Sequence, residues 1–323
     1  MSYLARRFSH GVLLLLGVSI LSFVFLQLAP GNFFDEMRLN PQITHTTVTQ
    51  LYRQYGMDRP LPVRYFFWLR SVAKGQWGVS FAYNIPVASL VWTRALNTLL
   101  LTGSAAAVSW AIALVWGAFS ADRRNGLVDH ASTAFTSALL ITPDLLLVLA
   151  FLWIAVRTRW FHAGGMLSPA NTSQDVSSHV KDLLRHLIAP VAVLVLGSLP
   201  VLLRHTRAAM LEVLQSPFIH AVRAHGISRT RILFRHALPA AASPLISLFA
   251  LSFGSLLSAS LLIEVVMNWP GIGPLLLEAI MARDVYVVIG AVMFSALLLV
   301  GGTLLGDVLL FIGDPRIRTE RLG

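Results

Sequence analysis

Long runs of apolar residues recur along this 323-residue chain, and they constrain its fold more than any other feature. A helix of about 20 apolar residues crosses the hydrocarbon core of a membrane, which is about 30 Å thick. Only 12% of the residues are charged, which is about half the fraction found in water-soluble domains. The sequence therefore predicts an all-α polytopic membrane protein with six transmembrane helices. The expected spans are residues 11–28, 96–121, 131–156, 187–203, 238–266 and 285–311.

The positions of the arginines orient these spans. Short cytoplasmic loops are enriched in basic residues, and the N-terminal segment, the loop 204–236 and the C-terminal tail are all rich in arginine. Six spans that start in the cytoplasm bring all three segments to that side, so both termini are expected there. The expected parts are an N-terminal transmembrane helix (1–31), an external segment with an interfacial helix near 63–74 (32–97), a five-helix core (98–312) and a cytoplasmic tail (313–323).

The start of the chain also resembles a secretory signal peptide, because basic residues precede an apolar run. The run is longer than a typical signal core, which favours an uncleaved membrane helix.

The composition and the missing motifs exclude several classes of protein. The net charge of +10 comes almost entirely from arginines, many of which flank apolar runs rather than forming one basic face, so nucleic-acid binding is not expected. The chain has no cysteine and no His-x-x-x-His pair, so we predict no metal site. Neither Lys74 nor Lys181 lies in a Gly-Lys-Ser/Thr loop. The chain is therefore not expected to be an enzyme or to hold a nucleotide cofactor, and any ATP hydrolysis belongs to another polypeptide.

One short basic stretch, residues 218–239, lies between two apolar runs. Pro217 suits the first turn of a helix, and Gly226 suits the left-handed residue that ends one. The pattern predicts a two-turn helix over 218–225, then a second helix that Ser228 caps and that leads into the membrane. Composition alone is equally consistent with a basic loop that only fixes orientation.

The spacing of this stretch resembles the loop of permease subunits of ATP-binding-cassette importers, where a glycine precedes a Leu-Pro pair by about a dozen residues. Gly226, Leu238 and Pro239 occupy those positions. The match is partial, because His220, Ala221 and Val222 replace the usual Glu-Ala-Ala. Further segments resemble the dipeptide, oligopeptide and nickel branch of that family: Leu28–Gly31, Met57–Val63, Glu264–Gly273, Ala282–Asp284 and Asp314–Arg316.

The resemblance implies the type I architecture and a permease subunit of an ATP-driven importer, for peptides or related small solutes, in the bacterial inner membrane. Its implied partners are a second homologous permease, two cytoplasmic ATP-binding subunits, a periplasmic or lipid-anchored substrate-binding protein, and membrane lipid. The implied ATPase-coupling residues are Phe218, His220, Ala221, Val222, Arg223, Ala224, His225, Gly226, Leu238 and Pro239. The implied signature turn contains Trp269, Pro270, Gly271 and Gly273.

Charged and small residues inside the spans are candidates for a translocation pathway. A charged side chain within a membrane usually faces protein or water, and small residues allow close helix packing or leave room for a passage. For Asp144 a pathway role and a buried structural role remain open, whereas Glu264 and Asp307 favour a structural role. The candidates are Asp144, Ser252, Ser255, Ser258 and Glu264. An alternative function is an ion-coupled secondary transporter that acts alone, with Asp144 as its titrating group.

Overall fold

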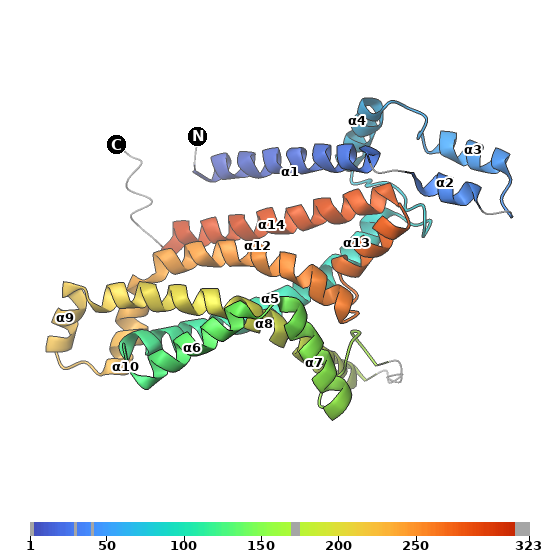
Figure 1. Cartoon of the computed structure of the whole chain (residues 1–323). Helices are drawn as coiled ribbons and strands as arrows, with labels where there is room; N and C mark the ends of the chain where they lie inside the picture. The colour runs from blue at the N-terminus through green and yellow to red at the C-terminus, as the bar shows by residue number, and fades with distance from the viewer. Residues whose placement is uncertain (1–2, 29–30, 40–41, 169–174, 314–323) are drawn as a thin grey trace. The chain divides into compact units, whose positions relative to one another are not determined.

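The computed structural model describes residues 3–28, 31–39, 42–168 and 175–313, and within these ranges the chain is helical with no β-strand (Figure 1). One isolated bridge joins Val79 and Pro86. The helices before the middle of the chain are α1 (Tyr3–Leu28), α2 (Phe33–Arg38), α3 (His45–Gln54), α4 (Leu61–Val72), α5 (Val87–Asp122), α6 (Leu127–Ile141) and α7 (Asp144–Thr158). The others are α8 (Val176–Leu214), α9 (Pro217–Ala224), α10 (Arg229–Arg231), the π-helical turn η1 (Ile232–Ala237), α11 (Leu238–Ala240), α12 (Ala242–Val266), α13 (Ile272–Met281) and α14 (Val285–Gly313).

Five of these helices, α1, α5, α8, α12 and α14, are long and apolar enough to cross a membrane. Helices α6 and α7 pass the same test only when taken together, and a bend of 98° separates them. The all-α fold is thus confirmed among the described residues, with five candidate spans and a sixth if α6 and α7 are counted together as one broken span.

The third expected span, residues 131–156, is wrong as a continuous helix. Helix α6 ends at Ile141, and Thr142 adopts an extended conformation with ψ 116°. Pro143 explains the break, because its ring disfavours the helical conformation of the residue before it. The apolar composition continues across the break, so hydropathy alone did not reveal it.

The helix that contains the fourth expected span, residues 187–203, extends beyond this apolar run at both ends. Helix α8 starts at Val176 rather than near residue 187, and the Asp175 side chain accepts a hydrogen bond from the Ser177 backbone N–H at 3.3 Å. Hydrogen bonds from Ser177 also hold the pKa of Asp175 below its ordinary value. Pro190 and Pro200 lie inside the helix. The expected motif Asp314–Arg316 and the basic tail lie outside the described residues.

The chain divides into two compact units. Unit 1 contains residues 1–98 and 270–300, and unit 2 contains residues 99–269 and 301–323. In unit 1 a helix, α4, is present close to the residues of the expected interfacial helix. It packs on α1 through Trp68, whose ring centroid lies 5.1 Å from that of Phe23, while Phe66 and Phe67 remain exposed. Helix α4 therefore has one face on α1 and one aromatic face outward.

The segment between α1 and α5 also has a small core of its own in unit 1, built on buried Phe34, Val48 and Met57. Buried Asp284, at the start of α14, joins that segment to the C-terminal half of the unit. Its Oδ2 accepts hydrogen bonds from the Ser80 hydroxyl at 2.6 Å and the Ala82 N–H at 3.0 Å. The family-like Ala282–Asp284 motif thus has a structural role at this junction.

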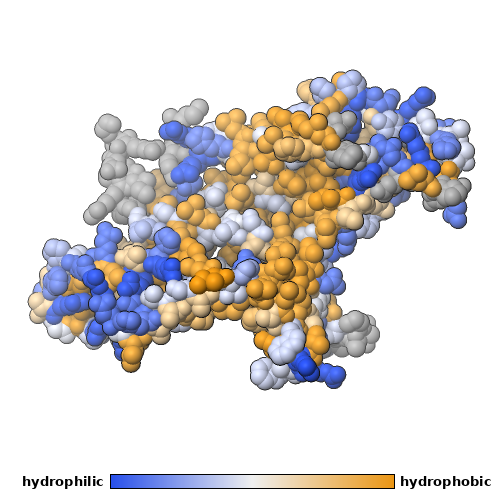
Figure 2. All heavy atoms as spheres, in the orientation of Figure 1, coloured by the Kyte–Doolittle hydropathy of each residue, from blue (hydrophilic) through white to orange (hydrophobic). Residues whose placement is uncertain are grey.

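Unit 2 contains two apolar cores along its helices. One surrounds Leu202 and Leu203 and the other surrounds Leu194 and Leu256. Helices α5 and α8 approach closely at Gly117, where a Cβ atom would come within 2.8 Å of Thr206 Cγ2. Figure 2 shows hydrophilic side chains gathered where unit 2 carries α9 and α10, and hydrophobic ones along the helices away from that end.

Candidate functional site: a pinned helix and a cavity in unit 2

The expected two-turn helix is present as α9, with both of its ends fixed by local geometry. Ser216 is extended before it, and Pro217 occupies the first turn. Gly226 has φ +71°, the left-handed region that glycine adopts without strain. Its N–H donates to the Arg223 carbonyl at 3.0 Å. Helix α9 therefore has a defined length and a defined exit direction.

Helix α9 has an inner and an outer face. Ile219 is fully buried, and Val222 is half-buried against the same apolar core. The side chains that remain exposed form what we call the outer face: Phe218, His220, Ala221, Arg223, Ala224 and His225. Most of the residues expected to couple to an ATPase thus lie on one accessible surface, with Val222 beneath it.

The chain returns from α9 to the membrane spans through α10, η1 and α11. Ser228 precedes α10 in an extended conformation, but its side chain makes no capping hydrogen bond, contrary to the expected cap. The backbone then widens into the π-helical turn η1. Pro239 accounts for this widening, because in a regular α-helix its ring would clash with the Arg235 carbonyl. The Leu238-Pro239 pair therefore marks a change in helix geometry just before α12.

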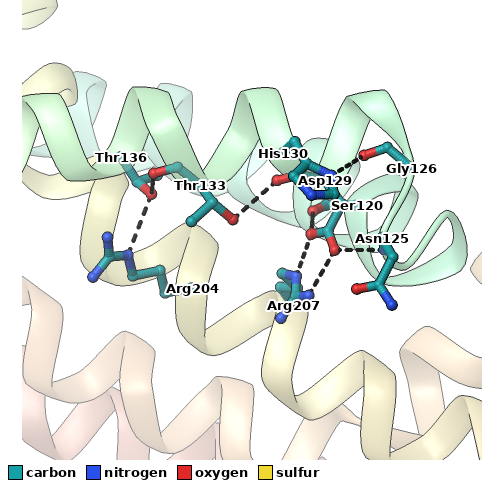
Figure 3. A network of polar contacts seen from close by, with 9 residues as sticks. All are labelled: Ser120, Asn125, Gly126, Asp129, His130, Thr133, Thr136, Arg204 and Arg207. Carbon is teal, nitrogen blue, oxygen red and sulfur yellow. Dashed lines mark hydrogen bonds and ion pairs between the residues drawn. The ribbon is translucent and has the colours of Figure 1, made fainter.

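A buried ion pair holds the end of α8 that leads into α9 (Figure 3). Arg207 donates from Nε and Nη2 to the two oxygens of Asp129 on α6, with an Nη2–Oδ2 distance of 2.7 Å. The same carboxylate accepts from the Ser120 hydroxyl at 2.8 Å and the Asn125 N–H at 2.9 Å. The Asp129 side chain is only 5% exposed. All four hydrogen bonds compensate for burying its charge.

A second contact between α6 and α8 lies beside this pair. Arg204 donates from Nε to the Thr136 hydroxyl at 3.2 Å and from Nη2 to the Ser137 hydroxyl at 2.8 Å. Two successive turns of α8 are therefore tied to α6.

Another ion pair holds the chain on the far side of α9. Arg229, in α10, donates from Nε to Asp122 Oδ1 at 2.7 Å and from Nη2 to the Asp122 carbonyl at 2.7 Å. Asp122 is the last residue of α5 and Asp129 lies in the first turn of α6, so the acids of the two pairs lie on either side of the turn between these helices. Sequence reasoning missed both pairs, since 78 and 107 residues separate the partners and local spacing carries no signal for them.

A cavity of about 410 Å³ opens among α7, α8 and α12. Asp144, Ser252 and Ser255 line it, together with Gly197, Ser198 and apolar side chains. Three of the five pathway candidates are thus brought together. Ser258 is exposed and Glu264 is fully buried, and neither lines this cavity.

The expected signature turn forms structure in both units. In unit 2, Trp269 is fully buried in the apolar core. In unit 1, the Asn97 side chain donates to the Pro270 carbonyl at 2.7 Å, and the Ile272 N–H donates to the Thr98 hydroxyl at 2.9 Å. Gly271 and Gly273 flank that contact at the start of α13. These hydrogen bonds anchor the turn. Asp307, for which the sequence favoured a structural role, is buried in α14.

One cluster of possible metal ligands occurs among the described residues, namely His162, Asp182 and His186. The two imidazole rings stack with centroids 3.9 Å apart, so their lone pairs do not converge on one point. His186 Nδ1 lies 2.9 Å from the Asp182 carbonyl, and the Ser168 N–H and hydroxyl donate to the Asp182 carboxylate at 2.7 and 2.9 Å. In this arrangement the cluster fastens the loop after α7 to the start of α8.

Several helices able to cross a membrane, a short helix with one exposed face and a cavity among the helices are features of membrane transport proteins. Comparison with known families makes this specific: residues 113–319 match the family described as binding-protein-dependent transport system inner membrane component, and residues 1–102 match its N-terminal region. The chain belongs to this family. It is a multi-pass protein of the inner membrane and a permease subunit of an ATP-driven importer.

Named relatives extend over the whole chain. The oligopeptide transport system permease protein AppB of Bacillus subtilis is 34% identical, covering 98% of this chain and 99% of AppB. The di/tripeptide transport system permease protein DppB of Pseudomonas aeruginosa is 32% identical over 99% of this chain and all of DppB. A chain of the inward-facing MetNI methionine ABC transporter matches the fold with a TM-score of 0.53 and 18% identity, covering 70% of this chain and 96% of that one.

Proposed function

We propose that this permease imports peptides and that α9 couples its spans to ATP hydrolysis on separate subunits. The relatives AppB and DppB, which are named for oligopeptide and di/tripeptide transport, support the substrate class. The observation that carries the coupling role is the geometry of α9, a short helix with an exposed outer face whose flanks are held by Asp129 at the start of α6 and Asp122 at the end of α5.

The proposed complex contains this chain, a second permease of the same family, two cytoplasmic ATP-binding subunits and a periplasmic or lipid-anchored substrate-binding protein. The N-terminus, α9 and the C-terminal tail lie in the cytoplasm. The proposed parts are those expected from the sequence, with 1–31 as the first membrane helix, 32–97 outside, 98–312 as the core and 313–323 as the tail.

In the proposed mechanism the outer face of α9 seats in a cleft of one ATP-binding subunit. Closure of the two ATP-binding subunits on nucleotide moves α9, and the rigid connections at Pro217 and Gly226 pass that movement to α8 and α12. The spans then change from an inward-open to an outward-open arrangement. Ser252, Ser255 and Asp144 line the part of the pathway within unit 2, and Ser258 and Glu264 act close to it.

Replacing Gly226 by proline tests the coupling role. Proline cannot adopt φ +71° and removes the N–H that donates to Arg223, so the exit from α9 must change. We expect Gly226→Pro to insert normally and to abolish uptake of the dipeptide Ala-Ala by the complete transporter in proteoliposomes, with ATP hydrolysis no longer stimulated by the substrate-binding protein.

Gly226→Asn is the matched control, since asparagine tolerates the left-handed region better than other residues with a side chain. It is expected to retain at least about half of the uptake. Normal uptake by Gly226→Pro would refute the coupling role of α9.

A further inference from the structure

We infer that the cavity around Asp144 binds the protonated amine of a passing solute, so that the permease itself selects substrates with a free amino group. This inference rests on the proposed function, because it takes the cavity as part of the translocation pathway. It assigns Asp144 as the group in that pathway that binds a cation, and a protonated amine as the part of the substrate that Asp144 binds.

The first argument is the position of Asp144 in the fold. It is the first residue of α7, directly after the 98° break between α6 and α7. Irregular backbone within a membrane is tolerated where it is buried in protein or lines a water-filled cavity, and a carboxylate there faces a partner or water. Asp144 meets this condition because it lines the cavity among α7, α8 and α12.

The second argument is that the carboxylate of Asp144 is available to a ligand. The residue is exposed, and no basic side chain within residues 3–28, 31–39, 42–168 and 175–313 forms an ion pair with it. Its direct neighbour on α8 is Gly197, where a Cβ atom would lie only 2.9 Å from Asp144 Oδ1. Glycine at 197 therefore leaves the carboxylate room to face the cavity.

The third argument is the hydrogen-bonding character of the lining side chains. The hydroxyl of Ser255 donates to the Ser252 carbonyl at 2.9 Å, and that of Ser252 donates to the Phe249 carbonyl at 2.8 Å. The Ser198 hydroxyl likewise donates to the Val195 carbonyl at 3.2 Å. Because these protons are directed to helix carbonyls, the hydroxyl oxygens act as acceptors. Ser252 Oγ already accepts from Trp110 Nε1 at 3.1 Å, and Ser198 Oγ lies 2.8 Å from the Ser109 hydroxyl. Of the three, Ser255 therefore presents its lone pairs to the cavity.

An acceptor set with one carboxylate suits a ligand that donates hydrogen bonds and carries positive charge. A primary ammonium group has three N–H donors and one positive charge. The remaining wall consists of apolar side chains, including Val193, Leu248 and Ala259, and suits the aliphatic body of a small peptide. A volume of about 410 Å³ is within the usual range for small-molecule sites.

Binding to the purified chain tests the site without the rest of the transporter. Butylammonium chloride at millimolar concentration should raise the thermal unfolding midpoint of the wild-type chain in detergent, whereas sodium butyrate at the same ionic strength should not. Asp144→Asn, which keeps the size of the side chain, should abolish the shift. Asp58→Asn, at an exposed acid in unit 1, is the matched control and should keep it.

Transport by the complete complex provides the second readout. Asp144→Asn should reduce ATP-driven uptake of Ala-Ala by about tenfold or more, the loss expected for one charge-assisted hydrogen bond. Stimulation of ATP hydrolysis by the substrate-binding protein should stay within about twofold of wild type. Gly197→Ala, which pushes the Asp144 carboxylate aside, should reduce both the butylammonium shift and the uptake. This variant replaces Asp144→Asn in the test if Asp144→Asn does not accumulate in the membrane.

The outcomes separate this inference from the proposed function. No ATP-driven Ala-Ala uptake by the wild-type complex contradicts the proposed substrate class itself. Wild-type uptake with no butylammonium shift, or unchanged uptake by Asp144→Asn, overturns the amine site alone. A parallel loss of uptake and of ATP hydrolysis in Asp144→Asn assigns the residue to structure and also overturns it.

Discussion

Asp129 joins three parts of unit 2 through one buried carboxylate. Its oxygens accept hydrogen bonds from Arg207 on α8, Ser120 on α5 and the Asn125 backbone between α5 and α6. Removing one partner of a buried ion pair is more damaging than removing both, because it leaves an uncompensated charge in a poorly solvated place. The stability of this junction is therefore expected to depend on the two charges together.

Thermal unfolding of single and double variants measures this dependence. Asp129→Asn leaves the Arg207 guanidinium without its anionic partner and is expected to lower the free energy of unfolding by about 3 kcal/mol. In detergent this corresponds to a fall of about 4–8 °C in the unfolding midpoint. The double variant Asp129→Asn/Arg207→Gln should recover part of the loss; strictly additive effects would show that the two side chains do not interact.

At the scale of the element, α9 divides its side chains between stability and recognition. Ile219 fills the apolar core, whereas Phe218 is 52% exposed on the outer face. Both are large apolar residues at consecutive positions. Their roles differ only because their side chains point to different faces of α9. Exposed aromatic residues often supply most of the binding energy where one protein docks into a pocket of another.

Alanine variants at these two positions are expected to have opposite phenotypes. Ile219→Ala should lower the free energy of unfolding by about 2–4 kcal/mol, since it opens a cavity in the core. Phe218→Ala should leave the unfolding midpoint within about 1 °C of wild type and weaken binding of the ATP-binding subunits at least about tenfold. Co-purification of the complex measures the second effect, and retention of those subunits by Phe218→Ala would exclude it as a docking residue.

At the scale of the whole molecule, the proposed orientation follows from charge and the number of spans. Positive charge favours the cytoplasmic side for the loop 204–236, and this places the segment between α1 and α5 outside. The absence of cysteine from the sequence makes the orientation easy to measure, because every introduced thiol is the only one present.

Single-cysteine labelling tests this orientation. Ala221→Cys, on the outer face of α9, should react with a membrane-impermeant maleimide only after the cells are opened. Ala82→Cys, exposed before α5, should react in cells whose inner membrane is intact. Labelling of Ala221→Cys from outside would contradict both the topology and the coupling role.

The spans and α9 were predictable because their signals are local. The lengths of the apolar runs predict α1, α5, α12 and α14. Pro217 and Gly226 predict the two ends of α9. The break before Asp144 was missed because hydropathy is averaged over a whole span. Pro143 does not lower that average, and it acts only on the backbone conformation of the residue before it, Thr142. The start of α8 was missed because its first turns are polar. The pairs Asp129–Arg207 and Asp122–Arg229 depend on tertiary folding, which no local pattern contains.

The two flanks of α9 are anchored with unequal strength. The two acids are equally buried, each with 5% of its side chain exposed, but Arg207 is 28% exposed whereas Arg229 is 66% exposed and more open to competing ions. Salt weakens an exposed pair much more than a buried one, so a pull on α9 should yield first on the Arg229 side. In the proposed coupling, α8 would therefore stay in place, and the movement of α9 would pass more through η1 into α12 than into α8.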